Sequence, residues 1–176
     1  MKSFFKILFF LFIIKNTVAQ DLTNIVYLEL NDGRVVIEMK PDDAPKHVER
    51  IKELISEKFY DGLKFHRVID GFMAQTGDPK GNGTGGSGQN IPAEFNSLPH
   101  IRGTVSMARA QDPDSADSQF FICFKESSFL NGQYTAWGQV IEGMEFVDKI
   151  KRGSGDNGRV DNPDKIISMR LAKEVN

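Results

Sequence analysis

The chain has 176 residues, of which 22 are basic and 24 acidic, and its formal net charge is −2 at pH 7. A mildly acidic chain lacks the basic surface that nucleic acids and anionic membranes attract, so neither is expected as a partner. Cys123 is the only cysteine, which excludes an intramolecular disulfide, and its apolar neighbours predict a buried side chain.

The first 19 residues have the pattern of a secretory signal peptide. Lys2 and Lys6 precede a short apolar stretch from Ile7 to Ile14, and Thr17 and Ala19 supply the small residues of a cleavage site. The apolar stretch is shorter than the roughly 20 residues that span a bilayer. We therefore expect an exported protein of a bacterial periplasm or a similar compartment, with an uncleaved membrane anchor as the alternative.

Cleavage after Ala19 would remove three lysines and leave residues 20–176 with a net charge of −5. A chain of this length can bury a proper core as one domain. We expect that domain to be a monomer that needs no metal or cofactor and makes no membrane contact once the signal peptide is removed.

The mature domain is predicted to begin with a β-hairpin, followed by a helix. Residues 24–30 and 34–39 are β-rich and flank Asn31-Asp32-Gly33, a strong hairpin signal. Pro45 suits the first turn of a helix. The spacing of the following residues predicts an apolar helix face made of His47, Val48, Ile51, Leu54 and Ile55.

Short strands are predicted for the remainder of the chain, at residues 63–68, 72–76, 103–108, 119–124, 135–140 and 166–172. A second helix is expected near Met144 to Ile150. Many short strands separated by Gly and Pro indicate a mainly β barrel or sandwich. The segment from Asp78 to Asn90 is rich in Gly, Asn and Ser, so we expect a flexible surface loop of the kind that frames a site.

Several familiar chemistries lack their motifs. Gly81, Gly83 and Gly86 have the spacing of a dinucleotide-binding loop, but no helix follows them. Residues 85–89 lack the last glycine of a hydrolase nucleophile elbow. The three histidines have no zinc spacing, and the aspartates of residues 112–117 lack the glycine and glutamate of a calcium loop. The sequence thus predicts no nucleotide, hydrolytic or metal site.

Two other segments have the composition of a binding pocket. Residues 65–75 and 118–122 place Arg67, Gln75 and Gln119 among large apolar side chains. A small apolar pocket with a few fixed polar groups has this composition, and it suits an enzyme that binds a peptide without cutting it. Taken singly, each of these residues is more often structural, so the hypothesis depends on their joint occurrence.

The same segments resemble the cyclophilins over about residues 24–172. The resemblance implies peptidyl-prolyl cis–trans isomerase activity on a mainly β fold, an eight-stranded antiparallel closed β-barrel capped by two α-helices. The matching blocks, in family order, are Phe65-His66-Arg67-Val68-Ile69, Gly71-Phe72-Met73, Gln75, Gly77-Asp78, Gly103 to Ala108, Ser118-Gln119-Phe120-Phe121-Ile122, Phe129-Leu130-Asn131-Gly132 and Gly138 to Met144.

By this resemblance, Arg67 is the catalytic residue and the partners are proline-containing polypeptides. The resemblance also implies a substrate-binding set: Phe72, Met73, Phe121 and Leu130 around the proline ring, Gln75 and Gln119 on the peptide backbone, the main chain of Ala108, Arg109 and Ala110 in an adjoining groove, and Phe129 and Tyr134 as further pocket walls.

The chain departs from the common family pattern at a few of these positions. Many members carry Trp and His where Phe129 and Tyr134 stand here. Without the indole N–H donor, we expect at most weak binding of cyclosporin. Asp70, Thr76 and Arg109 also differ, and we expect them to alter the preference of the groove rather than the chemistry.

The sequence favours an isomerase that assists the folding of exported proteins, and two other classes stay open. One is a binding module or holdase chaperone that grips proline-containing segments with little turnover. The other is a structural subunit of an envelope complex. Arg67 favours the isomerase, because binding alone would tolerate its loss.

Overall fold

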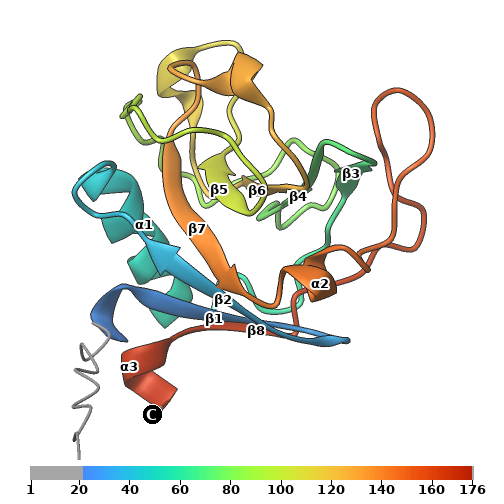
Figure 1. The fold of residues 1–176 in the computed structure, drawn as a ribbon, viewed down its shortest axis with the longest axis horizontal. Coiled ribbons are helices and arrows are strands. Elements are labelled where there is room, and N and C mark those ends of the chain that lie inside the picture. Colours follow the sequence, from blue (N-terminus) through green and yellow to red (C-terminus); the bar gives the residue numbers. More distant parts are fainter. Residues whose placement is uncertain (1–21, 176) are drawn as a thin grey trace, which may run out of the picture.

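The computed structural model describes residues 22–175 (Figure 1). The predicted signal peptide, residues 1–19, lies outside the described residues, as do residues 20, 21 and 176. In the part of the chain that is described, no helix combines the length and the apolar character needed to cross a membrane.

The described residues form one eight-stranded antiparallel sheet with the strand order β3-β4-β6-β5-β7-β2-β1-β8. Every predicted strand is present, with boundaries shifted by at most four residues. The strands are β1 (Ile25–Leu30), β2 (Gly33–Met39), β3 (Arg67–Ile69), β4 (Met73–Thr76), β5 (Thr104–Met107), β6 (Phe120–Cys123), β7 (Ala136–Glu142) and β8 (Ser168–Leu171).

The sheet curls into an open half-barrel, so the prediction of a closed barrel is wrong. Its edge strands β3 and β8 do not pair with each other. Residues 63–66, predicted as strand, are irregular and meet the segment before β8 at only a few points. The Phe65 N–H donates to the Asp164 carbonyl at 2.9 Å, and Lys64 and Lys165 form an isolated bridge. These contacts span the gap without forming a ladder.

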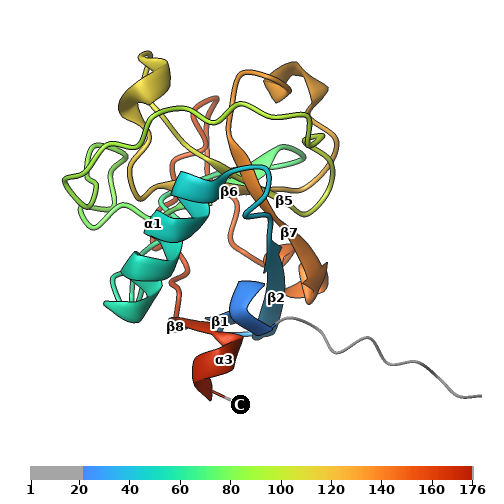
Figure 2. The same ribbon diagram turned by 90° about the vertical axis from the view of Figure 1, so that its left-hand side faces the viewer.

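The helices agree only partly with the two that were predicted. The first, α1 (Pro45–Ser56), is confirmed, and its buried residues are the five of the predicted apolar face. The second, α2 (Met144–Val147), is a single turn rather than a helix to Ile150. A third helix, α3 (Ala172–Val175), directly follows β8 and was not predicted; Figure 2 shows it beside β1 and β8. Short 3-10 turns lie at η1 (Leu22–Asn24), η2 (Pro113–Ser115) and η3 (Ser128–Leu130).

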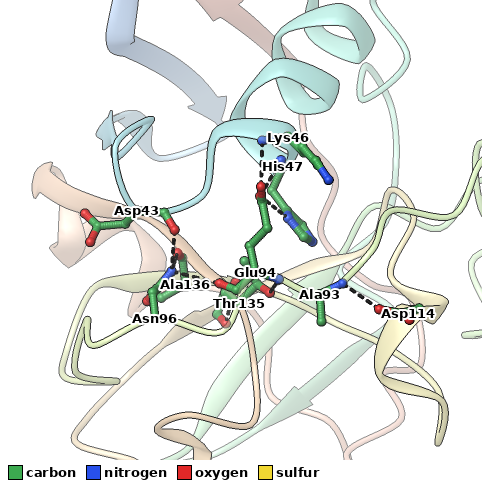
Figure 3. A network of polar contacts seen from close by, with 10 residues as sticks. Asp43, Lys46, His47, Ala93, Glu94, Asn96, Asp114, Thr135 and Ala136 are labelled. Carbon is green, nitrogen blue, oxygen red and sulfur yellow. Dashed lines mark hydrogen bonds and ion pairs between the residues drawn. The ribbon is translucent and has the colours of Figure 1, made fainter.

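The first turn of α1 is capped by a distant carboxylate. Ala44, at the N-cap position, offers no side-chain acceptor. Instead, Glu94 Oε1 accepts from the Lys46 N–H at 3.1 Å, and Glu94 Oε2 accepts from the His47 N–H at 3.0 Å and contacts His47 Nδ1 at 2.7 Å (Figure 3). A negative side chain here satisfies N–H groups that a helix leaves unpaired and complements the helix dipole.

The segment around Glu94 also connects α1 to the rest of the fold. The Glu94 N–H donates to Thr135 Oγ1 at 3.0 Å, and the Ala93 N–H donates to Asp114 Oδ1 at 2.8 Å (Figure 3). Asn96 Nδ2 donates to the Ala136 carbonyl at 2.8 Å. Residues 93–96 thereby fix α1 relative to η2 and the start of β7.

Strands β4 and β6 are buried on both faces, and this places the candidate site. On one face, Ala74, Phe120 and Ile122 join the main core. On the other face, a second apolar cluster consists of Met73, Phe121, Cys123 and Leu130. A strand that is covered on both faces has a continuous run of apolar residues in its sequence, which explains Phe120-Phe121-Ile122-Cys123. The prediction that Cys123 is buried is confirmed, and burial raises the pKa of its thiol to about 12.

Candidate active site

The site starts from a row of residues across three neighbouring strands. Arg67 of β3 pairs with Gln75 of β4, and Gln75 pairs with Phe121 of β6. Directly opposed residues of an antiparallel ladder point to the same face of the sheet. A guanidinium, an amide and an aromatic ring therefore lie next to one another on the face that carries the second apolar cluster.

Two hydrogen bonds hold the Arg67 guanidinium. Nε donates to the Asn157 carbonyl at 2.9 Å, and Nη1 donates to Gln75 Oε1 at 3.1 Å. A guanidinium is planar and carries five N–H groups, so two bonds in different directions fix its plane and leave three donors available. Burial lowers the pKa of Arg67 from its usual value, but a guanidinium stays charged at neutral pH.

The two glutamines continue this chain of hydrogen bonds. Gln75 Nε2 donates to Gln119 Oε1 at 3.0 Å, and Gln119 Nε2 donates to the Gly85 carbonyl at 2.8 Å and the Gly83 carbonyl at 3.2 Å. Because Gln75 accepts from Arg67 and donates to Gln119, its amide has one orientation. The chain runs from Arg67 to the loop of residues 78–90.

Two aspartates hold that loop, which was expected to be flexible. Asp78 accepts from the N–H groups of Lys80 and Asn82 at 2.8 and 2.9 Å, and Asp117 accepts from those of Ser87 and Gly88, both at 2.9 Å. Burial would raise the pKa of Asp78, but the main-chain N–H groups that it accepts lower it below its usual range. The loop is therefore organised by its backbone bonds to two carboxylates.

Two of the loop glycines are required by close contact with these carboxylates. A Cβ at Gly85 would lie 2.1 Å from Asp78 Oδ1, and one at Gly86 would lie 2.2 Å from Asp117 Oδ2. Gly86, one of the three glycines whose spacing resembles a dinucleotide motif, thus lets the loop pack against Asp117, one of its own anchors.

Next to the row, an apolar pocket of about 250 Å³ opens on the outer face. It adjoins a more polar groove of about 360 Å³, and the two share Gln75, Ala108 and Arg109. The groove also contains the predicted residues Ala110 and Gln119. The structure thus brings all twelve predicted site residues together; the remaining pocket residues are Arg67, Phe72, Met73, Phe121, Phe129, Leu130 and Tyr134.

Aromatic side chains build the pocket walls. The Phe121 and Tyr134 rings meet edge to face, with centroids 6.0 Å apart, and the His100 ring stacks on Phe121 at 6.3 Å. The Phe129 and Phe72 ring centroids lie 5.4 Å apart, and Phe129 is 64% exposed. Phe121 therefore belongs to the floor of the pocket, whereas Phe129 lies at its rim.

Sequence reasoning missed several residues that shape the site. Asn157 contributes a main-chain carbonyl, which no side-chain pattern could reveal. The centroid of the Phe95 ring lies 5.9 Å from Arg109 Cζ, and that of the Tyr134 ring lies 4.6 Å from the same atom. Asp117 anchors the groove loop. Among residues 22–175, no group of three or more His, Cys, Asp or Glu residues could hold a metal ion.

An antiparallel half-barrel with an apolar pocket, one arginine and two glutamines on its outer face defines a cyclophilin-like protein. The sequence matches the family described as "Cyclophilin type peptidyl-prolyl cis-trans isomerase/CLD" over residues 25–171. The chain belongs to this family and is a peptidyl-prolyl cis–trans isomerase.

Individual relatives agree with this assignment. A "Probable peptidyl-prolyl cis-trans isomerase" of Brucella suis is 56% identical over 170 residues, which cover 89% of this chain and 87% of that protein. "Peptidyl-prolyl cis-trans isomerase B" of Bacillus subtilis is 44% identical over 130 residues, covering 72% of this chain and 90% of the relative.

Solved structures share the fold. The cyclophilin AquaCyp293 from Hirschia baltica has a TM-score of 0.79 and 28% identity, covering 89% of this chain and 76% of its own. A cyclophilin type peptidyl-prolyl cis-trans isomerase of Cryptosporidium parvum, crystallised in the presence of the dipeptide Ala-Pro, has a TM-score of 0.77 and 30% identity. That match covers 84% of this chain and 98% of the other.

Proposed function

We propose that this isomerase turns X-Pro bonds in exported polypeptides, with Arg67 as the catalytic residue and the apolar pocket as the site of the proline ring. The main observation that supports this proposal is the position of the Arg67 guanidinium. Two hydrogen bonds fix it at the edge of the pocket, and three of its N–H groups remain available to a ligand. The periplasmic location and the role in folding rest on the N-terminal sequence alone.

The reaction needs a donor rather than a nucleophile. Rotation about a peptide bond crosses a barrier of roughly 18–20 kcal/mol, because amide resonance is lost when the bond twists. The twisted prolyl nitrogen regains a lone pair, and Arg67 can donate a hydrogen bond that the planar amide accepts poorly. A bond made mainly in the transition state raises turnover rather than affinity alone.

The pocket contributes by binding the ring and excluding water. Met73 and Phe121 are almost fully buried and form the floor beneath the ring, while Phe129 and Tyr134 stand at the sides. A dry site strengthens the hydrogen bond from Arg67.

The rate enhancement sets the energy that the site must supply. Shortening prolyl isomerisation from about 100 s to about 1 ms needs a factor of order 10⁵ in rate, or roughly 7 kcal/mol off the barrier. One preorganised charged donor supplies about 2.7–4 kcal/mol of this, and selective binding of the twisted bond has to supply the rest.

The C. parvum relative supports a proline-containing ligand, because it was crystallised in the presence of an Ala-Pro dipeptide. We extend this to the present chain as a preference for short X-Pro segments. Their residue before or after the proline would reach the groove, since the pocket and the groove share Gln75, Ala108 and Arg109.

The test is the rate of cis-to-trans conversion of a short X-Pro peptide by the wild-type protein and by Arg67→Ala. Removing a preorganised donor to developing charge lowers turnover by about 10²–10³-fold. Arg67→Lys should restore little, because a lysine cannot keep both the Asn157 and Gln75 contacts of the planar fork. Arg34→Ala, which removes an exposed arginine paired with Glu29, is the matched control and should leave the rate unchanged.

Wild-type rates in Arg67→Ala, with its fold retained, would refute the catalytic role. Negligible turnover in every variant, with peptide binding intact, would favour the proline-peptide binding module.

The export proposal has its own test, which is mass spectrometry of the exported protein. We expect the chain to start at Gln20, and an intact N-terminus would refute cleavage.

A further inference from the structure

Residues 153–160, here called the 153–160 loop, pack along the free edge of β3 (Figure 1). The Val68 N–H donates to the Gly158 carbonyl at 2.7 Å, and the Gly153 N–H donates to the Val68 carbonyl at 2.9 Å. The Val160 N–H donates to the His66 carbonyl at 3.1 Å. The strand that carries Arg67 is therefore held by β4 on one side and by this loop on the other.

The loop also binds the Arg67 side chain directly, through the Asn157 carbonyl that accepts from Nε. Gln75, the second acceptor, is a side chain that depends on Gln119 for its own orientation. The Asn157 carbonyl is part of the main chain, and its position is set by the loop. A turn within the loop, with the Gly158 N–H donating to the Gly155 carbonyl at 3.2 Å, fixes the local path.

We propose that the 153–160 loop is a positioning element for Arg67 and that Gly158 is its positioning residue. This inference rests on the proposed catalytic role of Arg67. The loop determines the direction in which the free N–H groups of the guanidinium point, and the chemistry depends on that direction. A misplacement of about 1 Å in a catalytic group can cost about 10²-fold in rate.

Gly158 is the residue that lets the loop approach β3. Its φ is +68°, a backbone conformation that residues with a side chain rarely adopt. A Cβ at this position would lie 2.4 Å from Ile69 Cγ1 and 3.0 Å from the Val68 carbonyl oxygen. Any larger residue would therefore push the loop away from β3 and take the Asn157 carbonyl with it.

The same loop offers a matched control. Gly155 has a φ of +67°, and a Cβ there would meet nothing closer than Asn157 Oδ1 at 4.0 Å. Gly155→Ala and Gly158→Ala thus impose the same backbone cost, but only the second imposes the clash with β3. We expect Gly158→Ala to lower kcat for an X-Pro peptide by tenfold or more with KM within twofold, and Gly155→Ala to leave both within twofold.

A double-variant experiment separates positioning from general damage to the fold. If Gly158 acts through Arg67, then adding Gly158→Ala to Arg67→Ala should cause no further loss of activity, because the group that the loop positions is already absent. Losses that multiply in the double variant would overturn the proposal. Equal activities of Gly158→Ala and Gly155→Ala, both folded, would also overturn it.

A measurement on the unaltered protein covers the case in which Gly158→Ala does not fold. The Nε–H of Arg67 should give a resolved NMR signal that exchanges at least tenfold more slowly with solvent than that of Arg102, whose half-exposed side chain bonds to Asp148 through Nη1 and Nη2 rather than Nε. Exchange as fast as that of Arg102 would overturn the proposal. A fully active Arg67→Ala variant would instead refute the proposed catalytic role, which keeps the two failures distinguishable.

Discussion

Glu94→Gln should destabilise the fold without changing the chemistry. Glu94 Oε1 accepts one main-chain N–H of α1, and Oε2 accepts a second together with the contact to His47 Nδ1. The glutamine amide replaces one oxygen by an NH₂ group, so at least one donor of the first turn then faces another donor. The change keeps the size of the side chain and removes its charge.

The expected cost has two parts. Leaving a buried donor unpaired costs about 1–3 kcal/mol, and losing a negative charge at a helix N-terminus costs about 0.3–1 kcal/mol. Together they predict a loss of about 1.3–4 kcal/mol in the free energy of unfolding. At roughly 2–4 °C per kcal/mol for a domain of this size, the Tm should fall by about 3–16 °C.

The assay is thermal and urea unfolding followed by the fluorescence of Trp137, the only tryptophan, which is fully buried. Glu53→Gln is the matched control, because Glu53 lies on the same helix but is half exposed. Surface changes of this kind stay within about 0.5 kcal/mol. A Tm for Glu94→Gln within 1 °C of the control would refute the assignment of Glu94 as the cap of α1.

The pH dependence provides a second check. Burial would raise the pKa of Glu94, but its bonds to the His47 side chain and to the N–H groups of His47 and Lys46 lower it below 4.5. A carboxyl group with a lowered pKa in the folded state stabilises the fold fully above its unfolded pKa and loses this effect as the pH falls through the folded value. The stability difference between wild type and Glu94→Gln should therefore shrink as the pH falls through the folded pKa of Glu94. Before that, below about pH 6.5, it should grow, because Glu94 raises the pKa of His47 that burial lowers, and protonation of His47 therefore costs the variant more than wild type. A difference that does not shrink below about pH 4 would contradict the assignment.

Three further predictions concern the site and its surroundings. Cys123, with its thiol pKa raised to about 12, should resist thiol reagents at pH 8 until the protein unfolds, and rapid labelling of the native protein would contradict its burial. Phe129→Trp should tighten cyclosporin binding by about two- to tenfold, since a net hydrogen bond contributes about 0.5–1.5 kcal/mol, and calorimetry would show an unchanged Kd if the indole N–H does not matter. The preference of the groove can be measured as kcat/KM for a peptide with Glu beside the proline divided by kcat/KM for the same peptide with Lys there. Arg109→Met should lower this ratio by about two- to fivefold, the range of an exposed ion pair. An unchanged ratio would show that Arg109 does not influence the groove.

The elements with a regular period could be predicted from the sequence. The five buried residues of α1 are those that the helical spacing selected, and Asn31-Asp32-Gly33 marks the turn between β1 and β2. Regular periodicity reports burial directly, because it reflects which face of an element meets the core. The boundaries of β3 could not be found in this way, since Phe65 and His66 are buried although residues 63–66 make only irregular contacts with the segment before β8.

The site was predictable only as far as the resemblance reached. The resemblance named Arg67 and the pocket residues as a site, and the strand register brings Arg67, Gln75 and Phe121 next to one another. The closed barrel expected from the same resemblance was wrong, because closure depends on hydrogen bonds between β3 and β8 that no local pattern encodes. The roles of the Asn157 carbonyl and of Glu94 as a helix cap could not be predicted for a similar reason, since both contacts join segments far apart in the sequence.

The burial of β4 and β6 on both faces has a consequence for how this protein can diverge from its relatives. Ala74 and Ile122 serve the main core while Met73 and Phe121, in the same two strands, form the floor of the pocket. A substitution in the floor is therefore constrained by the packing of the whole domain. Phe129 at the rim has no such constraint, because it is mostly exposed. Selection can thus change ligand preference at the rim while the floor, and the reaction it supports, is inherited almost unaltered.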